Sequence, residues 1–273
     1  MTMTGRRAAR KAASNPWSER LARLGLAARG VLFIVLGILT FRIAFGHFQA
    51  NASQQGALQE LASQPGGKIL VWIVAIGLIG YALWRLLAAA FGPIVDPVAI
   101  EAKQRVKALA EGIGYGAVAF LAVRVATGSS SSSTSGGSGQ KPASTVLSWP
   151  GGQFLVGLAG LVIIGIGVFF IVDGVRADFT KELKITTKPG ARKAVIALGR
   201  FGRISQGVVF GIIGVLVMIA AVKYQPGKAK GLDGALKTLA DQPYGKWLLG
   251  LIALGFLAYG MYGLAESKLR RLS

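Results

Sequence analysis

Long apolar stretches recur six times along the chain, each of roughly twenty residues rich in Leu, Ile, Val, Ala and Gly. About twenty residues of α-helix cross the ~30 Å hydrocarbon layer of a bilayer. No alternation of apolar and polar residues recurs, so the pattern does not indicate a membrane β-barrel. Backbone amides in lipid must be satisfied internally, so we predict transmembrane helices. The predicted spans are residues 25–46, 69–91, 109–127, 153–175, 204–222 and 247–265.

Lys and Arg are distributed unevenly between these spans. Most of them fall in the N-terminal tail, the second and fourth connections and the C-terminal tail. By the positive-inside rule, this bias predicts that both termini are cytoplasmic. A cleaved signal peptide is disfavoured, because Arg42 interrupts the first apolar run.

The composition narrows the class of protein. The 273 residues include 31 Lys+Arg and 11 Asp+Glu, a net charge of +20, yet 52% are hydrophobic and only 15% are charged. A nucleic-acid-binding or disordered basic protein would be more charged and less apolar. We therefore expect no nucleic-acid partner, and we expect the basic excess to meet anionic lipid at the inner leaflet.

Candidate catalytic chemistry is scarce. The chain has no Cys and one His, which removes disulfides and thiol nucleophiles and disfavours His-based metal sites or triads. It also lacks a phosphate-binding loop, an H-E-x-x-H pair and a G-x-S-x-G elbow. We expect a protein that is not an enzyme and that holds no metal or cofactor.

An internal repeat groups the spans into three hairpins. Residues 28–46 align without gaps with residues 110–128, and the fifth span places Gly207 where the first has Gly30. The even spans share a proline before the helix and, in two copies, a tyrosine within it. These repeat-motif residues are Pro65, Pro150, Pro243, Tyr81 and Tyr259. Repeats with the same orientation are related by an axis along the membrane normal, so we predict an all-α, pseudo-threefold bundle of six transmembrane helices.

The repeat unit carries a family resemblance. G-x-x-F/Y…R-x-A-x-G, then A-L-x-x-L-A-x-Q-P-x-G-K-x-L and G-L-x-x-Y-x-L-W-R, resembles the bacterial membrane family called domain of unknown function 1206 over residues 20–269. The resemblance implies three tandem hairpins in a bacterial plasma membrane and no assigned chemistry. The predicted organisation is a basic tail (1–19), hairpins at 20–92, 105–176 and 195–269, and a basic loop (177–194).

The outer loops differ between the copies. In the third copy, Leu232, Leu236 and Leu239 repeat with helical spacing, which predicts a short amphipathic helix with Asp233 as a plausible N-cap and Pro243 after its end. The first copy has a similar loop. The middle copy instead has a Ser/Gly-rich stretch, 129–139, which predicts a flexible linker.

Ionisable and polar residues at the inner ends of the spans are candidate functional positions, because charge is costly in hydrocarbon. Arg29, Glu111 and Gln206 align at the start of the odd spans. Around a central axis they would meet in one polar layer, where an Arg29–Glu111 pair would fix the register of the copies. Alternatively, each side chain extends separately to water or lipid phosphate.

Arginines near the outer ends are a second candidate site. Arg42 and Arg124 could form a positive channel mouth above an apolar gate, although the third copy has Ile219 at this position. The alternative is two arginines at head-group level.

A third group of charges lies toward the inner ends of the even spans: Arg85, Asp173 and Glu266. None of the charges is clearly at the midplane, where a coupled transporter usually needs one, so a pump is disfavoured.

Two functions fit these features. We favour a non-enzymatic accessory or scaffold that binds membrane lipids, a membrane-protein partner or a second copy of itself. The alternative is a passive channel or transporter for a small solute, with anions preferred by the arginine mouth.

Overall fold

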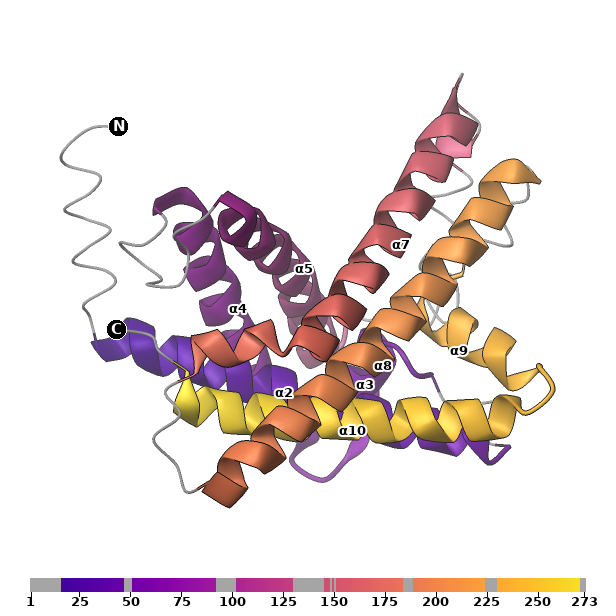
Figure 1. Ribbon diagram of the computed structural model, residues 1–273. Helices are drawn as coiled ribbons and strands as arrows, with labels where there is room; N and C mark the ends of the chain where they lie inside the picture. The colour runs from indigo at the N-terminus through magenta and orange to yellow at the C-terminus, as the bar shows by residue number, and fades with distance from the viewer. Residues whose placement is uncertain are drawn as a thin grey trace.

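The computed structural model is all-α apart from one isolated bridge between Leu183 and Arg270 in its described part (Figure 1). The described residues are 16–46, 51–91, 102–129, 145–147, 149, 151–183, 189–223 and 230–270. Within these ranges, six helices are long and apolar enough to cross a membrane. They are α2 (Pro16–Ala44), α4 (Gly67–Phe91), α5 (Ala102–Ala126), α7 (Gly152–Arg176), α8 (Pro189–Val222) and α10 (Gly245–Leu269).

The first helix of each hairpin begins earlier than the apolar pattern indicates. Helix α8 begins at Pro189, although the predicted span begins at residue 204, and it incorporates residues 189–194 of the predicted basic loop. Lys, Arg and Ala are good helix formers outside the hydrocarbon too. The apolar pattern therefore underestimates the length of these helices.

The tightest helix pairs join neighbouring repeats. The second helix of each repeat packs along the first helix of the next, so that α4 lies against α5 and α7 against α8. Helix α10 then returns to α2, as Figure 1 shows for these two neighbouring helices. The repeats are therefore linked in a cyclic order.

Two of the three hairpins are also closed internally. In the first, a Cβ added at Gly25 would lie 2.3 Å from Cβ of Tyr81, and in the third a Cβ at Gly202 would lie 2.5 Å from Cβ of Tyr259. These glycines sit at equivalent repeat positions, and each lets its helix press against the tyrosine backbone. Only glycine permits this approach.

The middle hairpin is splayed. Among the described helices, α2 packs against α4 and α8 against α10, but α5 and α7 share no comparable interface. The positions that hold glycine and tyrosine elsewhere hold Lys107 and Ile166 here. A lysine side chain cannot fit where the other copies allow no Cβ, so the sequence itself keeps this hairpin open.

Short helices α3 (Gln54–Ser63) and α9 (Leu232–Ala240) occupy the two predicted outer loops. The prediction for Asp233 was wrong: Gly231 is the N-cap of α9, and Asp233 lies in the first turn. Its carboxylate accepts a 2.9 Å bond from the amide of Ala52 and pairs with Lys237 at 2.9 Å. Asp233 therefore joins the two predicted outer loops.

The predicted basic loop at 177–194 folds partly into the core. A short 3₁₀ helix, η3 (Asp178–Glu182), places Phe179 and Leu183 in buried positions. Phe179 packs edge-on against Tyr262 with ring centroids 5.1 Å apart. Burying these side chains offsets the cost of ordering the loop. Most of the Ser/Gly stretch and Pro150 lie outside the described residues.

Candidate functional site: a charged layer beside a central cavity

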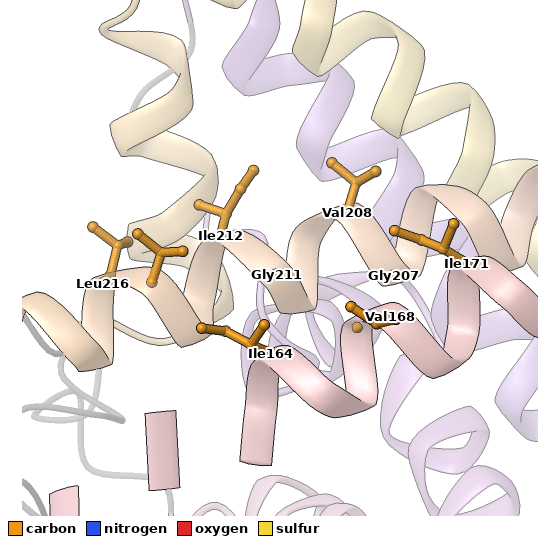
Figure 2. A pocket seen from close by; sticks show the side chains of 10 residues that line it. Ile164, Val168, Ile171, Gly207, Val208, Gly211, Ile212 and Leu216 are labelled. Atoms are coloured by element: carbon orange, nitrogen blue, oxygen red, sulfur yellow. The ribbon is translucent and has the colours of Figure 1, made fainter. Parts of the chain in front are cut away.

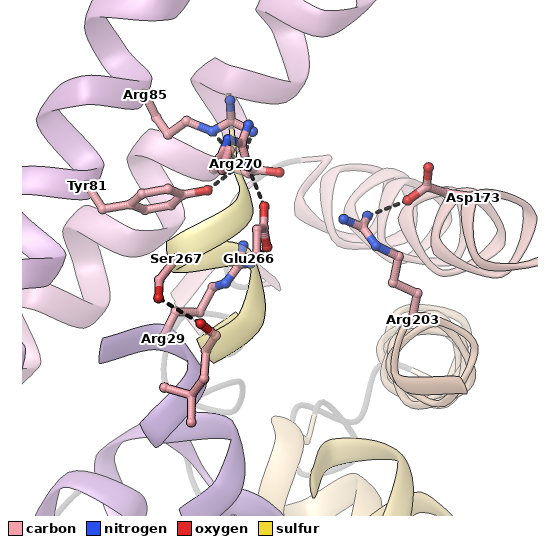
Figure 3. A network of polar contacts seen from close by, with 10 residues as sticks. Arg29, Tyr81, Arg85, Asp173, Arg203, Glu266, Ser267 and Arg270 are labelled. Carbon is pink, nitrogen blue, oxygen red and sulfur yellow. Dashed lines mark hydrogen bonds and ion pairs between the residues drawn. The ribbon is translucent and has the colours of Figure 1, made fainter. Parts of the chain in front are cut away.

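Each of the three interfaces between repeats holds an Arg–carboxylate pair, two of them buried and the third half-buried because Glu111 is 21% exposed (Figure 3). The pairs are Arg85 with Glu111 between α4 and α5, Arg203 with Asp173 between α8 and α7, and Arg29 with Glu266 between α2 and α10. A buried pair is costly when only half is present. Each pair therefore disfavours an arrangement that would separate its two helices.

Two of these pairs belong to larger clusters. Glu266 also accepts a 2.6 Å bond from Nη1 of Arg270, and Glu111 accepts bonds from Nε of Arg85 at 2.6 Å and from the hydroxyl of Tyr81 at 2.9 Å. Together with Arg29, the clusters contain three arginines and two glutamates. We call these two clusters, together with the Arg203–Asp173 pair, the charged layer. Arginines outnumber carboxylates in it, so it has an excess of positive charge.

Arg29 does not form the pair with Glu111 that the polar-layer hypothesis needs. Arg29 pairs with Glu266, because α2 packs along α10 and not along α5. Its guanidinium also lies within 6 Å of three tyrosine rings, 5.3 Å from that of Tyr259. These rings add cation–π stabilisation to the ion pair.

Arg29, Glu111 and Gln206 nevertheless line the same central cavity of about 460 Å³. The remainder of its wall is mainly apolar and aromatic, and it extends to Gln54 on α3 and Leu232 on α9. Gln206 is 8% exposed, and its Oε1 has no hydrogen-bond partner among the described residues. Buried polar atoms are nearly always satisfied, so this oxygen is suited to a ligand or water in the cavity.

The three candidate charges near the C-terminal ends of the even helices all form ion pairs between repeats. Arg85, Asp173 and Glu266 are all buried in the ion pairs described above. Two of their partners, Arg203 and Arg270, belong to the fourth connection and the C-terminal tail, whose basic residues were used only to predict orientation, yet both are buried.

The two arginines predicted to lie at the outer face, Arg42 and Arg124, each contact a group nearby in the chain. Arg42 Nη1 lies 3.1 Å from Oε1 of Glu60, and Arg124 Nη2 lies 3.4 Å from the carbonyl oxygen of Ser129. Neither is among the residues that line the cavity. The outer mouth stays a prediction.

The repeat-motif residues have structural positions. Pro65 and Pro243 lie in exposed turns before α4 and α10. The next residues, Gly66 and Tyr244, both have positive φ, of 72° and 64°. Tyr81 and Tyr259 are buried beside Arg29.

Sequence reasoning missed a second set of repeated arginines. Arg23, Arg105 and Arg200 occupy equivalent positions, and each donates to carbonyl oxygens at the C-terminal end of the helix that its own helix packs against. The acceptors are Ser267 (3.0 Å) and Lys268 (2.9 Å), Ala89 (3.0 Å) and Ala90 (2.9 Å), and Val175 (2.6 Å). Extending the alignment of Gly30 with Gly112 back by seven residues would have revealed them. Such bonds satisfy terminal carbonyls and complement the helix dipole.

A second hollow is a purely apolar groove between α7 and α8 (Figure 2). Here the helices approach closely, since a Cβ at Gly207 would lie 2.6 Å from the carbonyl oxygen of Gly167. Small residues at helix interfaces in membranes allow such close approach of two backbones. No polar side chain lines this groove, so we do not consider it a candidate functional site.

Comparison with known proteins gives a family but no activity. Three segments, 24–92, 106–177 and 201–270, match the family described as Domain of Unknown Function (DUF1206). An uncharacterized protein, YxxB, of Bacillus subtilis (strain 168) is 37% identical over 265 residues, covering 94% of this chain and 92% of that protein. No solved structure matches the chain. With its three tandem repeats and six candidate spans, the chain belongs to the DUF1206 family and is a multi-pass membrane protein of unknown function.

Proposed function

We propose that the protein is a non-enzymatic membrane accessory that holds an amphiphilic molecule in its central cavity. The observation that carries this proposal is a mainly apolar cavity bordered by the buried polar side chains of Arg29 and Gln206, one with an unsatisfied oxygen. Ligand sites typically combine apolar walls with a few placed polar groups. A lipid likewise combines apolar acyl chains with a polar head group.

The proposed topology follows from the charges. We infer a pseudo-threefold bundle with both termini in the cytoplasm, because the odd helices begin and the even helices end among basic residues. The charged layer then lies toward the cytoplasmic leaflet. The three equivalent inter-repeat arginines, Arg23, Arg105 and Arg200, support the pseudo-threefold order.

We propose no catalytic role for the layer. An acid–base residue must exchange protons with a bound substrate, whereas Glu111, Asp173 and Glu266 are each held by an arginine. The carboxylates stabilise the bundle in this proposal.

A passive pathway for a small anion is the second candidate. It is favoured by the excess of arginine in the charged layer and by Arg29, a buried cation in the cavity wall. Anion efflux from liposomes would support it, and a tight lipid-filled cavity without efflux would exclude it.

The test uses glycines that leave room for a side chain. Gly114 lines the cavity, and a Cβ there would meet nothing within 4 Å. Gly165 on α7 is equally unobstructed but does not line the cavity. The full chain would be purified in mild detergent, and its bound amphiphiles would be counted by native mass spectrometry.

We expect about one retained amphiphile per chain, severalfold less with Gly114→Phe, and no change with Gly165→Phe. A wild-type chain that retains nothing above the detergent background would refute the proposal, as would equal retention in both variants.

A further inference from the structure

The central cavity has one open side. Most of the described residues in its wall are buried or half-buried, but Ala110, Gly114 and Ile166 are exposed, Ile166 by 38%. These three lie on α5 and α7, the helices of the splayed hairpin. In a membrane, an opening between two spanning helices faces lipid.

The opening is specific to the middle repeat. Besides the Gly25–Tyr81 and Gly202–Tyr259 contacts, the closed hairpins have a second glycine on the opposite helix, Gly77 or Gly255. At Gly77 a Cβ would lie 3.1 Å from Cγ of Leu24, whereas the middle copy has Val162 at this position, and Val162 is exposed.

The middle repeat therefore lacks all three residues that close the other two hairpins, namely the glycine on each helix and the tyrosine. The two closed repeats are thus an internal control for the open one.

The charges that α5 and α7 themselves place beside the opening include Lys107 and Arg176, and Asp178 follows just after α7. Lys107 lies one turn before Glu111 on α5, and Arg176 is exposed at the same end of α7. The carboxylates on these two helices, Glu111 and Asp173, are both held by arginines. A phosphate-bearing head group complements such a rim better than a neutral or cationic one.

We propose that the gap between α5 and α7 is a lateral portal for an anionic phospholipid. One acyl chain would enter the cavity, and the phosphate would lie next to Lys107, at the edge of the charged layer. The cavity volume of about 460 Å³ is within the range of small-ligand sites, so the second chain stays in the bilayer. This inference rests on the proposed function, to which it adds the lipid class and the route of entry.

Two changes test the portal and its charge. Lys107→Gly with Ile166→Tyr gives the middle hairpin the closing pair of the other repeats, and Lys107→Gln removes the rim charge. Leu161→Tyr is the control for added bulk, because Leu161 is 58% exposed on α7 and does not line the cavity. Lys68→Gln is the control for charge, since Lys68 is an exposed lysine at the start of α4.

The full chain would be placed in nanodiscs of equal parts phosphatidylglycerol and phosphatidylcholine, and its retained lipids would be identified by native mass spectrometry. We expect wild type and both controls to retain phosphatidylglycerol with at least fivefold preference. The K107G/I166Y variant should lose most of its occupancy, and K107Q should keep its occupancy but lose most of the preference.

A second measurement does not depend on the folding of the closed variant. The chain has no native cysteine, so a G114C variant can be compared before and after alkylation with a bulky maleimide. Lipid retention should fall severalfold on alkylation, whereas alkylation of a G165C variant should leave it unchanged.

The outcomes separate the two proposals. If wild type retains no lipid, the proposed function itself fails. If alkylation at Gly114 lowers lipid retention but closure of the middle hairpin does not, the portal is refuted and the cavity proposal stands. If neither change lowers retention, both proposals fail. Equal retention of the two lipids by wild type would overturn the assignment of an anionic head group.

Discussion

Asp173 and Arg203 form the ion pair whose energetic role can be isolated most cleanly. Their side chains are 7% and 4% exposed, and they join α7 to α8. We consider Asp173→Leu, Arg203→Met and the double variant. Each single change leaves one buried charge without its ion-pair partner, whereas the double change leaves neither.

The expected magnitudes follow from this burial. Removing one member of a buried pair costs about 3–5 kcal/mol, whereas replacing both by apolar groups is close to neutral. Arg203 also lies 4.9 Å from the ring centroid of Phe179, so the double variant loses a cation–π contact of up to about 2 kcal/mol. We expect each single variant to lose about 3 kcal/mol or more, and the double variant to lose about 2 kcal/mol or less.

The assay is reversible unfolding in mixed micelles, with melting temperature as a second readout. For a chain of this size, 3 kcal/mol corresponds to about 6–12 °C. The matched control is the exposed pair of Arg42 with Glu60, whose side chains are 50% and 38% exposed. Its coupling should be within the ~0–1 kcal/mol of surface pairs.

If the double variant is as unstable as the sum of the two single variants, the pair contributes no coupling and the reasoning is refuted. A coupling at Arg42–Glu60 as large as that at Arg203–Asp173 would equally show that burial is not what matters.

Two further predictions concern packing. Gly25→Ala should destabilise the chain by about 1–3 kcal/mol because its Cβ would overlap Tyr81. Gly114→Ala is the control and should be nearly neutral, because a Cβ there lies in open space. Equal losses of stability in a thermal melt would contradict the close approach of Gly25 to Tyr81. Phe179→Ala should cost about 3–5 kcal/mol and increase proteolysis of the segment around η3, whereas Phe154→Ala, at a 73% exposed position, should leave the protease pattern unchanged.

Much of the fold was predictable because its requirements are local. Span length and backbone satisfaction dictate helices of about twenty apolar residues, and the repeat of Gly30 in Gly112 and Gly207 indicates three equivalent units. The family assignment from the same motifs is confirmed.

The choice of partners was not predictable in this way. The repeat alignment places Arg29 and Glu111 at equivalent positions along their helices, but it does not show which helices are neighbours. The observed partner, Glu266, belongs to another hairpin and aligns with Asp173, not with Glu111. A pair between repeats needs the cyclic order of the helices, which is a tertiary property.

The buried parts of charged segments were missed for a related reason. The basic residues of the fourth connection, which include Arg203, were used only to predict membrane orientation. Arg203 is buried because it pairs with Asp173 across the interface. Phe179 and Leu183, two apolar residues four apart in a basic loop, were the available signal for the folded segment.

The cyclic order has a consequence for biogenesis. Arg29 enters the membrane with the first helix, but its partner Glu266 is 237 residues further along the chain. At a synthesis rate of about 5–20 residues per second, Arg29 spends about 10–50 s in the translocon or lipid before its counter-charge exists. Closure between α2 and α10 is then the final step of assembly, and a chain truncated before α10 would leave that arginine as a marker for membrane quality control.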